Sequence, residues 1–563
     1  MRWTIKPAAD ENTAKYLGSE LGTDIAIARL LVQRGIKTFN QAKAFFRPKL
    51  KDLHNPLLMK DMDKAVTRIK AALVNNERIL IYGDYDVDGT TSVALMATYL
   101  ETKTSNISTY IPDRFDEGYG ISYKGIDYAQ DNNFSLIIAL DCGIKAIKKV
   151  EYAKKKEIDF IICDHHRPGK DLPEAIAVLD PKRMDCKYPF KDLCGCGVGF
   201  KLIQALGQNY NESIEDLSIY LDLVATAIGA DIVPVVGENR ILAHYGLKQL
   251  NSNPRPGFKE LIKNIKKDVL SLTDVIFVIA PRINAAGRMK HGNYAVSLLK
   301  EKESAQVKMA AEEIESFNSS RRFLDKETTK QALLQIHKRN EIEKSTTVVY
   351  NSNWNKGVIG IVASRLIETY YRPTIVFTKS GDFLTASARS VRGFDIYQAL
   401  EKCSQYIEQF GGHKYAAGLS IKEENYLDFK SAFETEVKSS LAVHFKTPEI
   451  FIDTEISLNS LTPKLYRVLK QFAPFGPQNL APVFMTNDVF DSGYCKCIGE
   501  DDKHLKISVH KDNSNTFNCI GFGLGSKLNI PHNKEPFAIA YTLDENHWNG
   551  KISLQLKLKD LKQ

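Results

Sequence analysis

Short apolar runs alternate with helical stretches in the first half of the chain. Five runs rich in β-branched residues read as strands, at 78–84, 108–113, 135–143, 159–166 and 175–180. Amphipathic or apolar helical segments separate several of them. Nearly continuous apolar strands that alternate with helices predict a parallel sheet covered by helices on both faces.

The pattern changes twice further along. Residues 300–340 contain no Gly or Pro and are rich in Lys, Glu, Ala and Gln, which predicts a long polar helix that bridges two domains. A second α/β region follows, with strands over 346–351 and 373–379 around a helix over 357–371. After about residue 447, short β-like runs separated by turn residues predict an all-β barrel, and an OB-fold fits its size.

These changes divide the 563 residues into five parts, since a chain of this length exceeds what one hydrophobic core can organise. The predicted fold class is α/β, with a parallel-sheet domain, a long connecting helix, a second α/β domain and a C-terminal all-β OB-fold. The expected boundaries are 1–50 for an N-terminal helical extension, 51–298 for the parallel-sheet domain, 299–343 for the connecting helix, 344–446 for the second α/β domain and 447–563 for the OB-fold.

Composition excludes several classes of protein. There is no run of about 20 apolar residues and no apolar signal-peptide region at the N-terminus, so we expect a cytoplasmic protein without membrane contact. Nine cysteines include two C-x-C pairs, which do not have zinc-site spacing and predict reduced thiols. The net charge of +8 is compatible with a polyanionic partner but too small to identify one.

Acidic and imidazole side chains follow three of the predicted strands. They are Asp84, Asp86 and Asp88 after the first strand, Asp141 after the third, and His165 and His166 after the fourth. The carboxyl ends of parallel strands meet at one edge of a sheet, where ligands bind in open α/β folds. A further carboxylate, Asp222 on a predicted helix, is expected to face the same edge, and Asp231 follows nine residues later.

Taken singly, an Asp after a strand usually caps the next helix, and a His pair is usually solvated. Taken together, several carboxylates near a protein core repel one another and lose solvation unless a cation lies between them. Carboxylate and imidazole ligands suit a divalent ion such as Mn²⁺. Four or more carboxylates can hold two ions about 3.5–4 Å apart, which predicts hydrolysis of a phosphoester.

Nine motifs also carry a family resemblance. DYDVDG, DCG, DHH and LDLVATAIGADIVPV resemble the four successive motifs of the DHH phosphoesterase superfamily. Within it, the order and spacing of five more motifs are similar to the RecJ family of bacterial single-stranded-DNA-specific exonucleases. They are PRINAAGRM (281–289), WNKGVIGIVASRL (354–366), TASARSVRGFDIYQAL (385–400), GGHKYAAG (411–418) and FAPFGPQNLAPVF (472–484).

The resemblance spans essentially residues 50–563 and implies a function. The chain is expected to be a 5′→3′ exonuclease that releases 5′-mononucleotides from single-stranded DNA in recombination and repair. It would use two divalent ions, Mn²⁺ or Mg²⁺, in a DHH catalytic domain, beside a DHH-associated substrate-binding domain and a nucleic-acid-binding barrel. Single-strand-binding protein and a helicase are possible partners, and a monomer is the default expectation.

The resemblance also implies roles for individual residues. The expected metal ligands are Asp84, Asp86, Asp88, Asp141, His165 and Asp222, with Asp141 bridging both ions. The expected catalytic residues are Asp141, His165, His166 and Asp88. The expected contacts to the DNA backbone and its 5′-phosphate are Arg114, Arg282, Arg288, Ser387, Arg389, Gly411, Gly412 and His413.

Two departures from the family pattern limit this transfer. Tyr82 stands where the superfamily often has a histidine, which leaves open which of the three clustered aspartates bind metal directly. Asn351 and Asn355 stand where histidines flank the tryptophan of the family motif, so no role of those histidines is carried over.

Two other functions are compatible with the site. A small-substrate DHH phosphoesterase would act on oligoribonucleotides, cyclic dinucleotides or pyrophosphate, but such proteins generally lack a barrel like the C-terminal one. An inactive scaffold that binds single-stranded DNA would be expected to lose metal ligands, which this chain retains.

Overall fold

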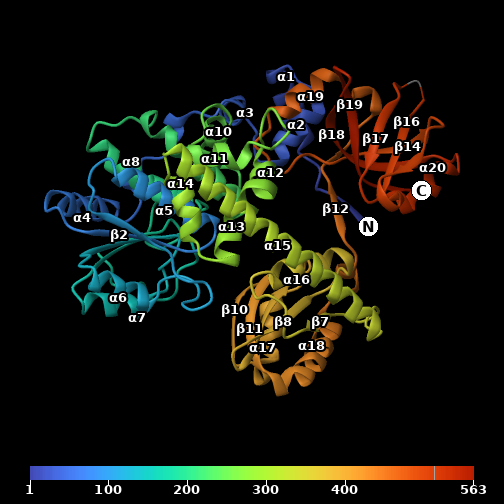
Figure 1. The fold of residues 1–563 in the computed structure, drawn as a ribbon. Helices are drawn as coiled ribbons and strands as arrows, with labels where there is room; N and C mark the ends of the chain where they lie inside the picture. The colour runs from blue at the N-terminus through green and yellow to red at the C-terminus, as the bar shows by residue number, and fades with distance from the viewer. Residues whose placement is uncertain (513) are drawn as a thin grey trace.

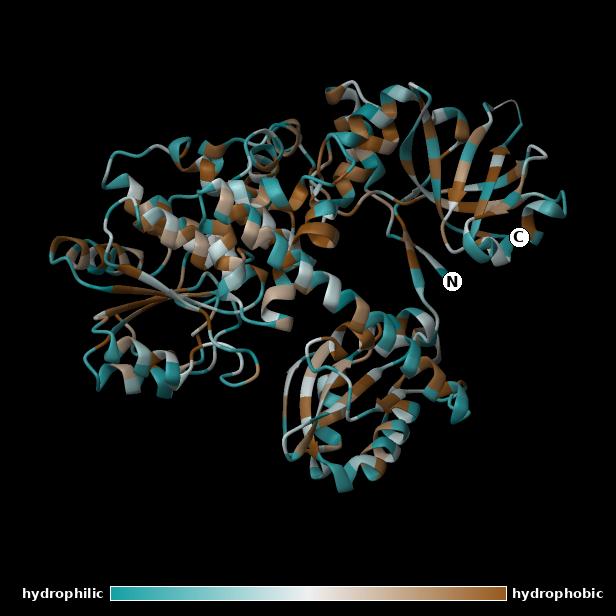
Figure 2. Ribbon diagram, viewed as in Figure 1, coloured by the Kyte–Doolittle hydropathy of each residue, from teal (hydrophilic) through white to brown (hydrophobic). Residues whose placement is uncertain are grey.

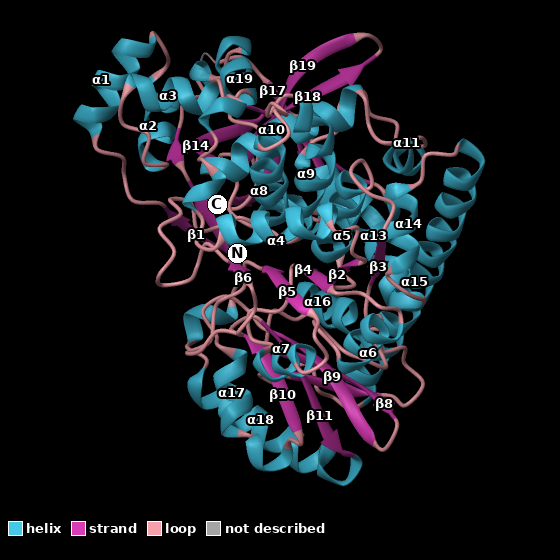
Figure 3. Cartoon of the chain, turned by 90° about the vertical axis from the view of Figure 1, so that its left-hand side faces the viewer, coloured by secondary structure: helices cyan, strands magenta, loops and turns pink. Residues whose placement is uncertain are grey.

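Figure 1 presents a computed structural model of the chain, which describes residues 1–512 and 514–563. Two α/β units and a β-barrel lie around the long helix α15 (Ser304–Lys338). The predicted α/β class with a C-terminal barrel is confirmed. In the side view of Figure 3, the second α/β unit lies below the first and α15 runs along one side.

The first unit contains a five-stranded sheet in which every pairing is parallel, as predicted. In spatial order its strands are β3 (Ile107–Tyr110), β2 (Ile79–Gly83), β4 (Leu136–Leu140), β5 (Asp159–Cys163) and β6 (Ala177–Leu179). The chain runs outward in opposite directions from β2 and β4. These neighbouring strands therefore form a topological switch point, where open α/β sheets bind ligands outside the carboxyl ends of the strands.

Alternate side chains of these strands enter two separate cores, which is why the strands read as continuous apolar runs. Ile79 and Ile81 pack on one face, and Leu80 and Tyr82 on the other. The helices on the first face are α4 (Met62–Val74), α5 (Val87–Leu100) and α8 (Gly195–Gln208). The helices on the second face are α6 (Tyr123–Asp131) and α7 (Ile147–Lys154). The strands of this sheet are accordingly the brown interior of Figure 2.

A helical layer completes the first unit and leads into α15. It consists of α9 (Leu221–Ala230), α10 (Gly237–Ser252), α11 (Pro256–Ile262), α12 (Leu272–Asp274), α13 (Ala280–Met289) and α14 (Asn293–Lys300). The helix α15 packs against α13 at one end and against α16 (Ile359–Thr369) of the second unit at the other. The predicted bridging helix is thus confirmed. No helix in the described ranges is both long enough and apolar enough to span a membrane.

The second α/β unit is built on a mixed five-stranded sheet. In spatial order its strands are β10 (Gln409–His413), β11 (Ala416–Lys422), β9 (Phe383–Arg389), β8 (Thr374–Ser380) and β7 (Thr347–Tyr350). Only β7 and β8 pair in parallel, because α16 connects them as a crossover. One face packs on α15 and α16, and the other on α17 (Ile396–Lys402) and α18 (Tyr426–Ser440).

The C-terminal strands close into a barrel with the connectivity of an OB-fold. The strand order is β14 (Phe484–Asp491), β18 (Phe537–Trp548), β19 (Lys551–Lys562), β17 (Phe517–Gly521) and β16 (His504–His510), closed by pairing of β14 with β16. Short additions are β13 (Thr454–Glu455), β15 (Lys496–Ile498), α19 (Pro463–Lys470) and α20 (Asn529–His532). The closed barrel leaves few unpaired edges.

The start of the chain differs from the prediction of a wholly helical extension. Residues Arg2–Ile5 form β1, which pairs in parallel with β12 (Glu449–Ile452) far along the chain. Only then do α1 (Glu11–Leu21), α2 (Ile25–Gln33) and α3 (Phe39–Phe46) follow, and their apolar faces share one hydrophobic cluster with the barrel. A four-residue strand stabilised by so distant a partner has no local signal in the sequence.

Candidate active site

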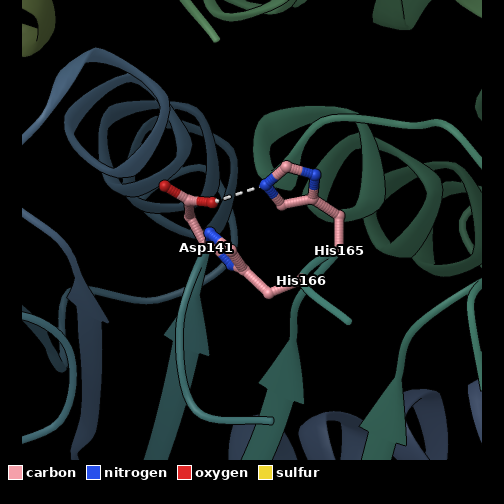
Figure 4. A group of neighbouring side chains, drawn as sticks. All are labelled: Asp141, His165 and His166. Carbon is pink, nitrogen blue, oxygen red and sulfur yellow. Dashed lines mark ion pairs between the residues drawn. The ribbon is translucent and has the colours of Figure 1, made fainter. Parts of the chain in front are cut away.

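Four side chains meet at the carboxyl edge of the first sheet, and we call this group the acidic edge: Asp88, Asp141, His165 and Asp231. Nε2 of His165 lies 3.2 Å from Oδ1 of Asp141, 3.6 Å from Oδ2 of Asp231 and 3.8 Å from Oδ2 of Asp88. Figure 4 shows Asp141 and His165 facing each other above the strand ends, with His166 beside them. The predicted convergence of the strand ends is therefore present.

The backbone explains this close approach. Asp141 directly follows β4 and has φ of +59°, a left-handed conformation that Asp tolerates and that often stores strain at functional sites. Gly195 lies against it, because a Cβ there would come within 2.5 Å of the Asp141 Cβ. The amides of Gly195 and Cys196 each donate a 2.7 Å hydrogen bond to the Asp88 carboxylate. These amides begin α8, where the helix dipole stabilises negative charge.

Electrostatics at the acidic edge favour a bound cation. Burial raises the pKa of Asp88, Asp141 and Asp231, and the neighbouring carboxylates raise it further. Burial, followed by the charge of His166, lowers the pKa of His165 to about 3, so its imidazole is neutral and able to bind metal. A divalent cation would remove the repulsion that opposes ionisation of the three carboxyl groups.

Unpartnered atoms at the acidic edge fit such a cation. Within the described part of the chain, Oδ1 of Asp141 and both ring nitrogens of His165 are buried without a hydrogen-bond partner. Two sets of side chains bring ligand atoms within 4.8 Å of one another: Asp88 with His165 and Asp231, and Asp141 with His165 and His166. Oxygen and imidazole donors in this arrangement suit Mn²⁺ or a similar divalent ion.

His166 is held from both sides. Its Nδ1 lies 2.7 Å from Oδ1 of Asp164, and its Nε2 lies 3.2 Å from the hydroxyl of Tyr119. Burial disfavours the charged ring, but the hydrogen bond and charge of Asp164 outweigh it and raise the pKa of His166 to about 9. Burial likewise opposes ionisation of Asp164, yet its bonds to His166 and to the amide of Ile144 lower its pKa to about 2. The contact with Asp164 therefore favours the protonated form of His166.

The other two clustered aspartates have structural partners. Asp84 is buried and accepts hydrogen bonds from the amides of Tyr85 and Gly120, at 2.6 and 3.1 Å. Asp86 caps α5 by accepting a 3.0 Å bond from the amide of Gly89. Neither belongs to the two ligand sets, although the charge of Asp86 raises the pKa of both Asp88 and Asp141.

The expectation that Asp222 faces this edge is wrong. Its carboxylate is fully buried and forms a bidentate ion pair with Arg255, with N–O distances of 2.8 and 3.0 Å. Asp231 takes the expected place. Asp222 lies in the first turn of α9, and Asp231 directly follows its last residue. Nine positions of an α-helix correspond to two and a half turns and a rise of about 13 Å, so the two side chains project in opposite directions from opposite ends of the helix.

The sequence marks Asp231 only by its place nine residues after Asp222, and the structure adds two further signs of a functional position. Asp231 lies at the C-terminal end of α9, where the helix dipole disfavours a carboxylate unless a cation is near. Ile232 follows with φ of +58°, a strained conformation for a β-branched residue of the kind that clusters at functional sites. Asp164, the first residue of the DHH motif, and Tyr119 hold His166, and neither was assigned a role from the sequence.

A second group of candidate residues lines a pocket of about 540 Å³ between the two α/β units. We call it the cationic pocket, after Arg114, Arg288, Lys356 and Arg389. Its wall also includes the predicted residues Ser387, Gly411 and Gly412, together with Tyr85. Arg389 donates a 2.9 Å hydrogen bond to the hydroxyl of Ser387, and the Arg114 guanidinium lies 4.7 Å from the centre of the Tyr85 ring.

Charge in this pocket is uncompensated. None of its four cations forms an ion pair with a carboxylate among the described residues. Burial, together with the charges of the nearby Arg114 and Arg389, lowers the pKa of Arg288 to about 9. Gly412 has φ of +145°, and a Cβ there would come within 2.4 Å of the carbonyl of Ala416, so this part of the wall is open backbone. Such a pocket suits an anion with several oxygens.

Two predicted phosphate contacts do not reach the pocket. Arg282 forms a 2.7 Å ion pair with Glu315 of α15 and donates to the carbonyl of Val278, so its charge is used to join α13 to α15. His413 is exposed at the end of β10 and is not part of the pocket wall. The structure corrects the prediction for Arg282, whereas the role expected of His413 stays a prediction.

The chain matches three family models in order. They are the DHH family N-terminal domain over residues 78–228, the DHHA1 domain over 343–439 and the RecJ OB domain over 452–560. The three matches together extend over most of the chain and all three globular units.

Individual relatives agree with these matches. The single-stranded-DNA-specific exonuclease RecJ of Bacillus subtilis is 36% identical over all of this chain and 70% of its own length. The Escherichia coli protein of the same name is 31% identical over 95% of each chain. A crystal structure of Thermus thermophilus RecJ in complex with Mn²⁺ matches all of this chain and 79% of its own, with a TM-score of 0.86 and 25% identity. A structure of the same protein with Mg²⁺ gives a TM-score of 0.80. By these full-length matches, the chain belongs to the RecJ family of single-stranded-DNA-specific exonucleases.

Proposed function

We propose that this protein is a metal-dependent 5′→3′ exonuclease that removes 5′-mononucleotides from single-stranded DNA in recombination and repair. The observation that carries the proposal is the adjacency of the acidic edge and the cationic pocket. Tyr85 lines the cationic pocket. In the chain it stands between Asp84 and Asp86, just before Asp88 of the acidic edge. The proposed metal site and the proposed phosphate site are therefore neighbours.

The proposed metal ligands are Asp88, Asp141, His165 and Asp231, with Asp86, whose charge acts on Asp88 and Asp141, as a further ligand for a second ion. Asp141 has the donor that best suits a bridging role, because its Oδ1 is buried, unpartnered and nearest to His165. When bound, two Mn²⁺ or Mg²⁺ ions activate water and stabilise both the attacking and the leaving oxygen at phosphorus. The metal-bound RecJ of Thermus thermophilus supports this choice of ions.

The chain's own residues would prepare the phosphate. His166 is fixed by Asp164 and Tyr119, and in the protonated form that Asp164 favours it can offer its Nε2 proton to a phosphate oxygen. It would orient the scissile phosphate and supply a proton as the 3′-oxygen departs. His165 would remain neutral as a ligand. The buried edge excludes bulk water from these contacts, which strengthens each of them.

The cationic pocket would set the direction of cleavage. A 5′-terminal phosphate held by Arg114, Arg288, Ser387 and Arg389 places the next phosphate of the strand toward the acidic edge. Cleavage there releases one nucleotide and leaves a new 5′-phosphate on the remaining strand. That new end has the same chemistry as the first, so the reaction can repeat.

Selectivity for single strands would come from the cleft and from the barrel. The barrel carries two exposed aromatic rings with lysines over them: Lys496 and Lys506 lie 5.2 and 6.0 Å from Tyr494, and Lys557 lies 5.4 Å from Phe522. None of these lysines has an ion-pair partner in the described ranges. Aromatic rings stack on unpaired bases of any sequence, while lysines bind the backbone. A duplex offers no free base faces to such a surface.

The proposed requirement for single strands suggests partners, and the free cysteines suggest a cellular compartment. An enzyme that requires unpaired DNA depends on a helicase or a single-strand-binding protein to provide and keep single strands, and we propose both as partners of a monomeric enzyme. Nine free cysteines, seven of them buried, fit the reducing cytoplasm.

The proposal can be tested with DNA labelled at the 5′ end. A long single strand and the same strand in a blunt duplex are each incubated with the protein, with Mn²⁺ or with EDTA. We expect immediate release of labelled mononucleotide from the single strand in Mn²⁺ alone. Activity restricted to dinucleotides or cyclic dinucleotides would replace the proposal with a small-substrate phosphoesterase. Binding to single strands without cleavage would replace it with a scaffold.

A further inference from the structure

Lys356 lies within the motif WNKGVIGIVASRL and on the wall of the cationic pocket, but neither the motif nor the proposed function gives it a role. It lies in the loop between β7 and α16, on the wall of the cationic pocket contributed by the second α/β unit. The other three cations come from separate elements: Arg114 from the loop after β3, Arg288 from α13 and Arg389 from β9. Lys356 is half-buried and has no carboxylate partner in the described part of the chain.

The loop that carries Lys356 is fixed against the first unit. Arg288 donates a 3.0 Å hydrogen bond from its guanidinium to the carbonyl of Gly357, the next residue. A Cβ on Gly357 would lie 2.4 Å from the carbonyl of Arg288, so only glycine permits this contact. The side chain of Asn355 accepts a 2.8 Å bond from the amide of Gly357 and closes the turn. The position of Lys356 is therefore built into the backbone.

From this position the ammonium group reaches across the boundary between the units. Its Nζ lies 5.9 Å from the centre of the Phe115 ring, which adjoins Arg114 in the first unit. Burial lowers the pKa of Lys356, and the charge of Arg114 lowers it further, so the two cations repel each other. Cations of two units thus face one pocket, and an anion between them would offset their repulsion.

We propose that Lys356 is a specificity-determining residue that, with Arg114, selects a terminal 5′-phosphate by bridging it between the two α/β units. This proposal rests on the exonuclease function proposed above and assigns a role to one more residue. A terminal phosphate monoester carries close to two negative charges at neutral pH, whereas an internal phosphodiester carries one. Four cations around one pocket match the dianion better. A 5′-hydroxyl end offers no phosphate for Lys356 and Arg114 to share.

The test compares substrates that differ only at the 5′ end. A single strand with a 5′-phosphate and the same strand with a 5′-hydroxyl are cleaved by the wild-type protein and by Lys356→Gln and Lys356→Arg. We expect the wild-type protein to prefer the phosphate, and Lys356→Gln to reduce that preference about tenfold through KM. Lys356→Arg keeps the positive charge and should retain most of the preference. Lys402→Gln is the matched control, because Lys402 is an exposed lysine of the same unit that pairs with Glu436 outside the pocket.

A binding measurement separates this proposal from the proposed function. Anisotropy of the two strands in EDTA reports recognition without cleavage, and Lys356→Gln should weaken binding of the 5′-phosphate strand alone. An unchanged preference in Lys356→Gln, or equal loss with both strands, would overturn the role of Lys356 while the exonuclease stands. A wild-type protein that cleaves neither strand but distinguishes them in EDTA would instead contradict the exonuclease function and leave the pocket assignment in place.

Discussion

The acidic edge and the cationic pocket are neighbouring regions that concentrate opposite charges. At the acidic edge, three carboxyl groups gather within 3.2–3.8 Å of one imidazole nitrogen. In the cationic pocket, four cations line a space of about 540 Å³ without a carboxylate partner in the described ranges. Each region concentrates one sign of charge. A bound cation would stabilise the acidic edge, and a bound anion would stabilise the cationic pocket.

The two regions differ because their groups differ in how readily they lose charge. Carboxyl groups can take up protons, and burial together with like charges raises their pKa, so they can pack closely. Guanidinium groups remain charged in the physiological range and stay apart around an open, hydrated space. A compact acidic cluster therefore indicates a small cation, and an open cationic pocket indicates a larger anion with several oxygens.

The largest effect is expected from breaking the acidic edge at its centre. Replacing Asp141 by Ala removes the donor proposed to bridge both ions, and we expect cleavage of single-stranded DNA to fall about a thousandfold or more. Binding of a 5′-phosphorylated strand should persist, because the cationic pocket is intact. Cleavage rates and anisotropy on the same preparation check both parts, and near-normal cleavage would refute the assignment.

The next effect distinguishes the two aspartates of the α9 region. We expect Asp231→Asn to weaken Mn²⁺ binding and to lower kcat about a hundredfold. Asp222→Asn should leave Mn²⁺ affinity unchanged but destabilise the fold by about 3–5 kcal/mol, because it breaks the ion pair between the buried Asp222 and the mostly covered Arg255 guanidinium. Calorimetric titration with Mn²⁺ and thermal unfolding of both variants test this, and the reverse pattern would restore Asp222 as the ligand.

A smaller effect is expected from the cationic pocket. Replacing Arg389 by Gln should raise KM for a 5′-phosphorylated strand about tenfold while kcat changes little, because it removes a phosphate contact and no metal ligand. Arg282→Gln serves as the control, since Arg282 pairs with Glu315 outside the pocket. Equal changes in both variants would mean that overall positive charge, and not the pocket, controls binding.

The smallest effect concerns stability. A saturating excess of Mn²⁺ should raise the Tm of the wild-type protein by about 5 °C, because the ion relieves repulsion among buried carboxylates. The Asp141→Ala variant should show little of this shift. A shift of the same size in both proteins would place the stabilising ion outside the acidic edge.

The sequence predicted the scaffold better than the contacts. The parallel strands could be recognised because each is a continuous apolar run, and the convergence of Asp141 and His165 follows from parallel topology alone. The pairing of β1 with β12 could not be predicted, because it joins segments more than 440 positions apart. The sequence also could not show whether Asp222 or Asp231 faces the sheet, because that depends on where α9 ends and on which way each of its side chains points.

The cationic pocket shows the same limit. A motif identifies an arginine but not the carboxylate that it pairs with. Arg282 and Arg288 are therefore equivalent in the sequence, and only the structure shows that Arg282 pairs with Glu315. The sequence gives no sign that Lys356 faces a pocket, because a lysine in a loop is usually solvated. Its significance depends on Arg288 and Arg114, which are distant in the sequence and adjacent in the fold.

The most direct test of the account measures the length of the first product. A single strand labelled on its 5′-phosphate is mixed with excess protein and Mn²⁺, and the reaction is stopped before a second turnover. If the cationic pocket holds the terminal phosphate and the acidic edge cleaves the next one, all released label is mononucleotide. Label released as dinucleotide or longer, or label retained while the 3′ end shortens, would contradict the account.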